Sequence, residues 1–247
     1  MLYALGGHGV DYLDARTVIG GSTLSPSQYH YITDARWTIE ASFEVYLGLM
    51  HRLSAQEPGI NTEGFHRDLQ DFSRIVYPNG YVGNMGKITG APFSGYEDFT
   101  LIVPSFGTQL TLKYPGDTER RNLHGNFSSV LLDNNLLSNK NPYSRDGVAA
   151  YLTGLYPYRI IRNNQNTGGP KALVIGDVHM LPVSTFLATG AGELHLIWPY
   201  TLPTADTLPE FINLHDFDIV LVGLNPHRLT GAGLGFLDGI TIGESAL

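Results

Sequence analysis

Hydrophobic residues in the C-terminal half of the chain follow a strand–helix–strand pattern. Residues 171–176 read Lys-Ala-Leu-Val-Ile-Gly, with four consecutive apolar residues closed by a glycine, which is typical of a fully buried parallel strand. Two further strand patterns lie at 193–197 and 217–223, and the segments 178–188 and 205–215 between them are compatible with helices. We therefore expect a βαβαβ unit whose three strands are parallel neighbours.

The N-terminal half contains one strong helix signal. From Ile39 to Leu53, apolar residues recur every three or four positions, which predicts an amphipathic helix with one buried stripe. Thr38 is the expected N-cap, and Glu40 in the first turn favours the helix dipole. The polar segment 31–37 then lies immediately before a helix N-terminus, where several polar side chains can be held together.

These elements indicate one α/β domain over residues 1–247, with three layers and a central parallel sheet, as in flavodoxin-like folds. Residues 76–135 contain Gly-rich and Asn-rich stretches around short strand patterns, so we expect a small β-rich or loop-like insertion there. Within it, residues 99–103 and 108–114 predict a β-hairpin. No internal repeat or low-complexity tract divides the chain.

Composition and charge exclude several function classes. The net charge of −8, with 15 scattered basic residues, argues against nucleic acid as a partner. The absence of cysteine excludes disulfides and thiolate metal sites, and leaves the compartment open. No apolar run approaches the roughly 20 residues that a membrane helix needs, so no membrane insertion is expected. The first residues lack the basic start and the apolar length of a signal peptide.

Several short motifs resemble those of one family in their order and spacing. Thr33-Asp-Ala-Arg-Trp-Thr38 precedes the predicted helix, a Gly-rich loop follows at Gly83-Asn-Met-Gly86, and the central strand ends in Asp177, with Leu187-Ala188 beyond it. The set resembles the DHHW family, SGNH-hydrolase-like proteins related to the alginate O-acetyltransferases. In that family the first motif is Thr-Asp-His-His-Trp-Thr and the strand ends in Asp-Ser. The resemblance implies an SGNH-hydrolase-like fold and an acylated polysaccharide as the substrate class.

The chain departs from that family at both reactive positions. By the resemblance, the nucleophilic serine corresponds to Val178, which has no group that can attack a carbonyl. The catalytic histidine corresponds to Arg36, which cannot act as a general base because the pKa of arginine exceeds about 12. Asp34, Trp37 and Asp177 keep the family's residue types. Because members of a catalytic triad act as a unit, the resemblance implies a catalytically degenerate module.

Val178 and Arg36 lead to two structural expectations. A valine at the strand tip should cover a shallow, partly apolar remnant of the cleft. Arg36 should pair with Asp34 or Asp177, because an unpaired buried guanidinium is costly. Two interpretations of Asp34 with Arg36 stay open: they bind an anionic or hydroxyl-rich ligand, or Asp34 caps a turn while Arg36 forms a surface ion pair.

Asp177 and His179 raise a second enzymatic possibility. A strand followed by Gly-Asp-x-His is also how metallophosphoesterases begin their two-metal site. The further Asp, Asn and His motifs that those enzymes need do not follow His179, so we expect no metal and no cofactor. His179 can still serve as a base if a hydroxyl such as that of Ser184 lies close to it. The alternative is that His179 is a hydrogen-bonded structural residue and that Asp177 caps the following helix.

Four residues are candidates for ligand binding: Trp37, Trp198, Tyr200 and Asn225. Aromatic faces stack on sugar rings, and Asn225 follows the last predicted strand, where it can donate a hydrogen bond into the cleft. The alternatives are that Trp198 fills core space and that Asn225 with the following proline forms a turn.

The sequence therefore predicts a catalytically degenerate SGNH-hydrolase-like module with a structural or glycan-binding role. The expected partners are a glycan or polysaccharide, or other proteins of a virion or cell surface, for example a phage tail, and a virion or extracellular location suits either. A content of 29 Gly and 14 Tyr is frequent in glycan binders and virion parts. The competing hypothesis is an active carbohydrate O-acetyl esterase or acetyltransferase with a re-sited nucleophile.

Overall fold

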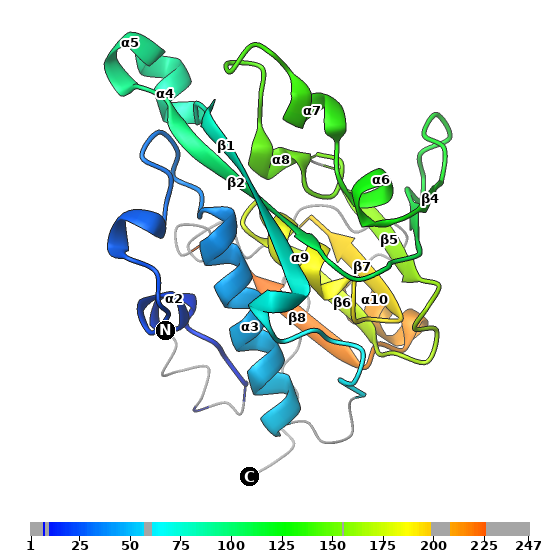
Figure 1. Cartoon of the computed structure of the whole chain (residues 1–247). Coiled ribbons are helices and arrows are strands. Elements are labelled where there is room, and N and C mark those ends of the chain that lie inside the picture. The colour runs from blue at the N-terminus through cyan, green and yellow to red at the C-terminus, as the bar shows by residue number, and fades with distance from the viewer. Residues whose placement is uncertain (1–6, 8–9, 57–60, 155, 199–207, 226–247) are drawn as a thin grey trace.

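The computed structural model describes residues 7, 10–56, 61–154, 156–198 and 208–225. Its core is a six-stranded sheet with the strand order β4-β3-β5-β7-β6-β8 (Figure 1). These strands are β3 (Leu110–Lys113), β4 (Leu123–Gly125), β5 (Tyr158–Asn163), β6 (Lys171–Gly176), β7 (Glu193–Ile197) and β8 (Ile219–Gly223). A separate two-stranded sheet consists of β1 (Phe72–Tyr81) and β2 (Glu97–Pro104).

Helices surround the sheet and connect its strands. The α-helices are α2 (Ala15–Gly20), α3 (Ile39–Gln56), α4 (Asn84–Thr89), α5 (Ala91–Ser94), α6 (Phe127–Leu131), α7 (Asn134–Ser138), α8 (Gly147–Ala150), α9 (Met180–Leu187) and α10 (Leu208–His215). Short 3₁₀ helices span Pro26–Gln28 and Leu69–Asp71. No helix in the described part of the chain is long and apolar enough to cross a membrane.

The predicted parallel unit is confirmed. Strand β6 lies between β7 and β8 and is parallel to both, with Leu173 opposite His195 on one side and Val220 on the other. Helices α9 and α10 occupy the two predicted connections. The other half of the sheet is antiparallel, because β5 runs against β7 and β3 runs against both β5 and β4.

Alternate residues of β6 enter two different hydrophobic cores, which confirms the three-layer architecture. Ala172 and Val174 belong to the large core that contains the buried residues of α3 and α9. Leu173 and Ile175 belong to a smaller core with Phe211 of α10. Because successive side chains of a strand point to opposite faces, this alternation requires a helix layer on each face.

The predicted hairpin between residues 99–103 and 108–114 is wrong. Strand β2 pairs with β1 in an antiparallel ribbon, and β3 pairs with β5 of the main sheet. The apolar runs were recognisable as strands, but adjacency in sequence suggested the wrong partner. Of the segment 76–135, which we expected to be an insertion, the β1–β2 ribbon stands apart from the sheet, with α4 and α5 at its far end, whereas β3 and β4 extend the sheet (Figure 1).

Helix α3 begins where the sequence predicts. The Thr38 hydroxyl accepts a hydrogen bond from the Ala41 amide at 3.1 Å, which satisfies a backbone donor of the first turn. The same hydroxyl donates to the Gln28 carbonyl at 2.6 Å, so the cap also ties the preceding loop to the helix. Residues 33–37 are thereby fixed immediately ahead of the helix N-terminus.

Candidate functional site

The carboxyl ends of the three parallel strands bring Asp177, Trp198 and Asn225 to one edge of the sheet. Asp177 follows β6 directly, and its carboxylate accepts hydrogen bonds from the backbone amides of His179 at 3.0 Å and Asn225 at 2.7 Å. The first contact closes a turn two residues ahead of α9, whose N-cap is His179, so Asp177 does not cap the helix itself as one interpretation held. The second, which sequence reasoning missed, joins the end of β6 to the segment after β8.

His179 lies in the centre of this edge and is 9% exposed. Its Nε2 lies 3.0 Å from the side-chain amide nitrogen of Asn225. Its ring contacts the Trp37 ring edge-on, at a centroid distance of 4.9 Å. Its Nδ1 has no hydrogen-bond partner among the described residues. Because Asn225 donates to Nε2, the ring proton belongs on Nδ1. Trp37 and Asn225, two of the predicted ligand-binding residues, are thus in contact with this imidazole.

Burial lowers the pKa of His179, and the positive charge of Arg36 and the nearby His30 lower it further. The carboxylates of Asp177 and Asp34 act in the opposite direction without reversing the result. The imidazole is therefore neutral at physiological pH.

Arg36 points toward Asp34, as predicted. Its Nη2 lies 2.6 Å and its Nε 3.0 Å from Oδ2 of Asp34, and both side chains are less than one-tenth exposed. The Asp34 carboxylate also accepts hydrogen bonds from the backbone amides of Arg36 and Asn84, at 3.1 and 3.2 Å. The bond from the Arg36 amide shows that Asp34 caps a turn, as one of the two interpretations held, but the ion pair is buried and does not lie on the surface. The other interpretation, binding of an anionic or hydroxyl-rich ligand, stays a prediction.

Two residues that sequence reasoning missed complete this cluster. Tyr81, at the end of β1, donates its hydroxyl hydrogen to Asp34 at 2.7 Å and accepts from Arg36 at 2.6 Å. Asp146, which caps α8, lies 3.0 Å from Nη1 of Arg36. Only the capping pattern of Asp146 before Gly147 was visible in the sequence, and it gave no indication of a contact with a residue 110 positions away.

The electrostatics of the cluster favour the charged forms of both partners. Burial alone would raise the pKa of Asp34, but the hydrogen bonds from Arg36 and Tyr81 more than offset it and lower that pKa to about 2. Burial would lower the pKa of Arg36, and the carboxylates of Asp34 and Asp146 instead hold it above its ordinary value. Arg36 is therefore a permanent cation that neither donates nor accepts a proton in catalysis.

The Gly-rich loop after β1 is built against Asp34. A Cβ atom at Gly83 would lie 2.4 Å from the Cβ atom of Asp34, so only glycine fits at this position. The Gly83 amide donates to the Thr33 hydroxyl at 2.7 Å, and that hydroxyl donates in turn to the carboxylate of Glu97 on β2. These contacts make the ribbon part of the wall that holds Asp34 in place.

Val178 occupies the position after Asp177 and is half-buried, with its side chain packed against the large core. That Val178 seals the remnant of a cleft stays a prediction. Ser184, the hydroxyl considered as a partner for His179, is fully buried in α9 and makes no hydrogen bond to the described residues. A hydroxyl closed off from solvent in this way is not accessible to a substrate.

Two predicted ligand-binding residues remain, Trp198 and Tyr200. Trp198 is half-buried after β7, and its amide donates to the Pro157 carbonyl at 2.9 Å, which fixes the backbone at the edge of the sheet. Tyr200 lies outside the described residues. Among the residues that the structure describes, no group of three or more His, Asp or Glu side chains could hold a metal ion.

Solved structures of known proteins share this fold. A DHHW family protein from Eubacterium siraeum matches with a TM-score of 0.69 and 16% identity, over 92% of this chain and 69% of that protein. The fold is that of a DHHW family protein. Bacillus cereus PatB1 matches with a TM-score of 0.63 and 18% identity over 85% of this chain, both with a sulfonyl adduct and without it.

These comparisons confirm the predicted resemblance at the level of the fold, which this chain shares with a DHHW family protein and with PatB1. It spans 64% and 66% of the length of PatB1 in the two structures. No family model and no curated protein sequence matches the chain.

Proposed function

We propose that this chain is a non-catalytic SGNH-like module that binds a neutral glycan at the carboxyl edge of its sheet. The observation that carries the proposal is the state of Arg36, at the position where the family has its catalytic histidine. Its guanidinium is held by two carboxylates and a tyrosine hydroxyl, and it remains protonated. A side chain so paired can act neither as a base nor as a mobile proton donor.

The nucleophile is missing as well. Val178 carries no reactive atom, and Ser184 is enclosed in the core. The buried imidazole of His179 is neutral, but its Nε2 is occupied by Asn225, and neither of its ring nitrogens is bonded to a hydroxyl group among the described residues. A re-sited esterase needs a hydroxyl within hydrogen-bond reach of a base, and the described residues of this edge place none beside His179.

What this edge offers a ligand is aromatic surface with a few polar groups. Trp37 and Trp198 are both half-buried, and the neutral His179 and the Asn225 amide lie beside the first of them. Arg36 is paired with Asp34 and Asp146 within the protein, so its guanidinium is not available to an anionic ligand. Half-exposed indole rings next to uncharged hydrogen-bonding groups suit the alternating apolar faces and hydroxyls of a neutral sugar better than an ionic ligand.

Two measurements test this proposal. The purified chain should hydrolyse an activated acetyl ester at the background rate, and a neutral acetylated oligosaccharide should shift the NMR signals of the two indole N–H groups saturably. Trp37→Ala should weaken that binding at least tenfold, whereas Arg74→Gln, on the exposed ribbon, should leave it unchanged. Ester hydrolysis that is lost in His179→Ala would contradict the proposal and favour the re-sited esterase.

The reciprocal experiment restores the family's residue types. Val178→Ser with Arg36→His replaces the missing nucleophile and base. Measurable ester hydrolysis by this double variant, absent from each single variant, would show that the chain is a degenerate form of an acyl-transfer site. Because Arg36→His leaves Asp146 without its guanidinium partner, folding of the double variant has to be verified by circular dichroism before its activity is interpreted.

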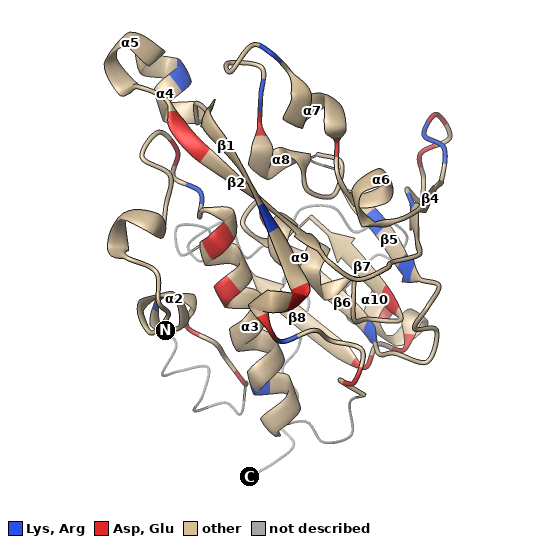
Figure 2. Ribbon diagram, in the orientation of Figure 1, with Lys and Arg blue, Asp and Glu red and all other residues tan. Residues whose placement is uncertain are grey.

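A structural role in a larger assembly, for example a virion, is a second candidate, and the tip of the ribbon favours it. Ile88 of α4 and Phe93 of α5 are 86% and 89% exposed, and Met85, Tyr96 and Ile32 are also exposed. Between residues 84 and 96 the only charged residue is Lys87 (Figure 2). Exposed apolar clusters of this kind mark interaction sites. We propose that the tip, residues 84–96, inserts into an apolar groove of a neighbouring subunit.

Sedimentation velocity tests the assembly role. The wild-type chain should associate with rising concentration, and Ile88→Ser with Phe93→Ser should abolish that association. Ile75→Ser with Val76→Ser changes two exposed apolar residues on the same ribbon away from the tip and should leave association intact. A wild-type chain that stays monomeric, and that behaves like both variants, would count against self-assembly through the tip.

A further inference from the structure

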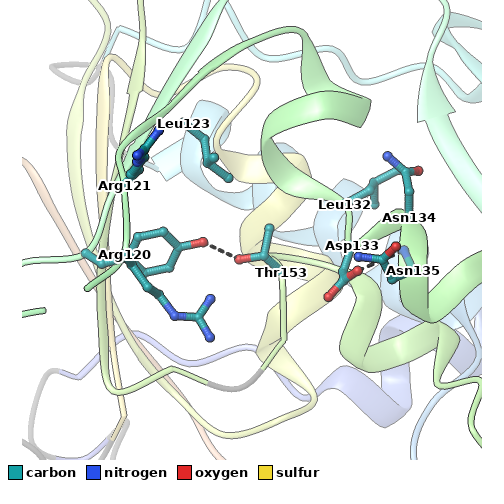
Figure 3. Close-up of a pocket in the computed structure, with 9 residues that line it drawn as sticks. Arg120, Arg121, Leu123, Leu132, Asp133, Asn134, Asn135 and Thr153 are labelled. Carbon is teal, nitrogen blue, oxygen red and sulfur yellow. Dashed lines mark hydrogen bonds between the residues drawn. The ribbon is translucent and has the colours of Figure 1, made fainter. Parts of the chain in front are cut away.

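Outside the cluster around Asp34 and the sheet edge that carries His179, the surface contains a hollow of about 400 Å³. Its walls come from the segment that connects β3 to β4 and from the start of α7. The lining residues include Arg120 and Arg121 on one side, Asp133, Asn134 and Asn135 on the other, and Thr153 between them (Figure 3). None of these residues belongs to the cluster around Asp34 or to the edge that carries His179.

Two arginines at the mouth of the hollow present their guanidinium groups to solvent. Arg120 lies over the rings of Tyr114 and Tyr156, with its Cζ atom 5.2 and 4.9 Å from the ring centroids, which fixes its orientation. Its ion pair with Asp117 is loose, at 3.8 Å. Arg121 is exposed and forms no ion pair or hydrogen bond with the residues that the structure describes.

A third arginine lies immediately behind this wall. Arg159 of β5 is 0% exposed, and its Cζ atom is 5.8 Å from the centroid of Tyr156, the ring that Arg120 also covers. It donates one hydrogen bond, from Nη2 to the Gly154 carbonyl, next to Thr153. Its Nε and Nη1 have no partner among the described residues. A buried cation without a carboxylate is costly, and its field is weakly screened.

The backbone beside the hollow is strained. Leu152 and Thr153 have φ values of 55° and 58°, and Gly154 follows at 94°. Two consecutive non-glycine residues in the left-handed region are uncommon, and such strain concentrates at functional sites. Here the strain turns the Gly154 carbonyl toward Arg159 and places the Thr153 hydroxyl beside that of Tyr114, at the base of the hollow (Figure 3).

The acidic residues near the hollow are already occupied by other donors. The Asp117 carboxylate accepts hydrogen bonds from the Tyr156 hydroxyl and from the amides of Glu119 and Arg120. Asp133 accepts from the amides of Asn135 and Leu136 and caps α7. They reduce the positive potential but do not neutralise the three guanidinium groups by direct contact, apart from the loose pair of Arg120.

We propose that this hollow binds an oxyanion, either a phosphate or a carboxylate group of a ligand. Arg120 and Arg121 contact the anion through their planar donors, the side-chain amides of Asn134 and Asn135 offer further hydrogen bonds, and Arg159 stabilises the bound charge from behind. Arginine is suited to this task because its guanidinium matches the geometry of both groups. The site is separate from the edge proposed to bind a glycan, so either proposal can be refuted without affecting the other.

An NMR titration of the whole chain tests the site, with inorganic phosphate in one arm and acetate in the other, against sodium chloride at matched ionic strength. At least one anion should shift the amide signals of Thr153 and Asn135 saturably beyond the chloride control. Saturation by phosphate alone assigns a phosphate-bearing ligand, and saturation by acetate alone a carboxylate-bearing one. If neither anion exceeds chloride, the proposal is wrong.

Variants separate a built site from general attraction. Arg120→Gln with Arg121→Gln should raise the dissociation constant at least tenfold, and Arg159→Met should raise it severalfold without touching the exposed surface. Arg74→Gln removes one exposed arginine elsewhere and should change nothing. Because Arg120 and Arg121 are exposed, their replacement tests the site even if Arg159→Met fails to fold. Equal binding by the double variant and by Arg74→Gln would overturn the proposal.

Discussion

Arg36 and Arg159 are both buried, but Arg36 is paired with carboxylates and Arg159 is not. Arg36 is 6% exposed and is held by Asp34, Asp146 and Tyr81. Arg159 is 0% exposed and has one backbone carbonyl as its hydrogen-bond partner among the described residues. Burial acts on both, but the carboxylates raise the pKa of Arg36, whereas the pKa of Arg159 falls to about 10.

The difference indicates what each position does. A fully paired guanidinium has a structural role, because any change in its charge or its contacts leaves buried carboxylates unsatisfied. The buried guanidinium of Arg159 has one carbonyl and the Tyr156 ring as partners but no carboxylate among the described residues, and two of its nitrogens have no hydrogen-bond partner there, which is why we expect it to serve a bound anion. The cluster around Arg36 is thus fully paired, while an unrelated face has the unsatisfied groups that a binding site needs.

The same substitution at the two positions gives the largest contrast. Arg36→Met leaves Asp34 buried without its cation and should reduce the free energy of unfolding by about 3–5 kcal/mol. Arg159→Met removes a buried charge with no carboxylate partner and should change it by no more than about 1 kcal/mol in either direction. Urea denaturation of both variants measures the difference. Equal losses of unfolding free energy at both positions would refute the distinction between a structural arginine and a ligand-binding arginine.

The sequence accounts for the three-layer fold and for the place of the cluster, but not for its composition. The apolar run 171–176 and the periodic helix from Ile39 are local signals, and local signals are strong where burial repeats with a fixed period. The pairing of Arg36 with Asp34, two residues apart, followed from the cost of a buried charge. Asp146 and Tyr81 reach the cluster from distant segments through tertiary packing, for which the sequence offers no periodic signal.

The wrong hairpin has a related cause. The apolar residues 99–103 were recognisable as a strand, but strand partners are chosen by packing over long sequence separations. The partner strand β1 has a solvent-exposed middle, with Ile75 and Val76 both exposed, so it lacks the alternation that would have identified it. Arg159 was missed for the opposite reason. An arginine within an apolar strand looks like a surface residue until the structure shows it to be enclosed.

Acid should reduce the difference in stability between the wild type and Arg36→Met. The pKa of Asp34 is about 2 in the folded protein against an ordinary value of 3.8, so this carboxylate adds stability that is complete above pH 3.8 and lost as pH falls through about 2. At about 1.4 kcal/mol per pKa unit, and allowing for solvent screening, that is about 1–2 kcal/mol. The wild type should therefore lose more stability than Arg36→Met between pH 4 and about 2.

The comparison with Arg36→Met is needed because other carboxylates titrate over the same range. The pKa of Glu193 is also lowered to about 2, by hydrogen bonds from His195 and Arg162 that outweigh its burial. This contribution is common to the wild type and the variant and cancels in their difference. Parallel acid denaturation curves for the two proteins would show that Arg36 does not stabilise the charged form of Asp34.

Tyr81→Phe sharpens the view of the cluster as a fully satisfied network. The change removes one hydroxyl that donates to Asp34 and accepts from Arg36, and it keeps the ring that packs against Tyr31 at a centroid distance of 4.6 Å. Hydrogen bonds to charged groups contribute about 1.5–3 kcal/mol, so we expect a loss of about 2 kcal/mol in urea denaturation. Tyr96→Phe, an exposed tyrosine at the ribbon tip, is the control and should be neutral. A neutral Tyr81→Phe would mean that the ion pair does not depend on the hydroxyl.

Ser184→Ala is expected to have the smallest effect and the opposite sign. The Ser184 hydroxyl is fully buried in α9 without a hydrogen-bond partner among the described residues, whereas its neighbour Thr185 donates to the Leu181 carbonyl at 2.7 Å. Removing an unsatisfied hydroxyl relieves a desolvation cost, and alanine is a better helix former than serine, so the variant should be more stable by about 0.5–1 kcal/mol. Thr185→Val, which deletes a satisfied hydroxyl of nearly the same size, should instead be destabilising. If Ser184→Ala lost stability, Ser184 would have a hydrogen-bond partner. If it abolished an ester hydrolysis that the wild type performs, Ser184 would act on a substrate, and the proposal that this module is non-catalytic would be wrong.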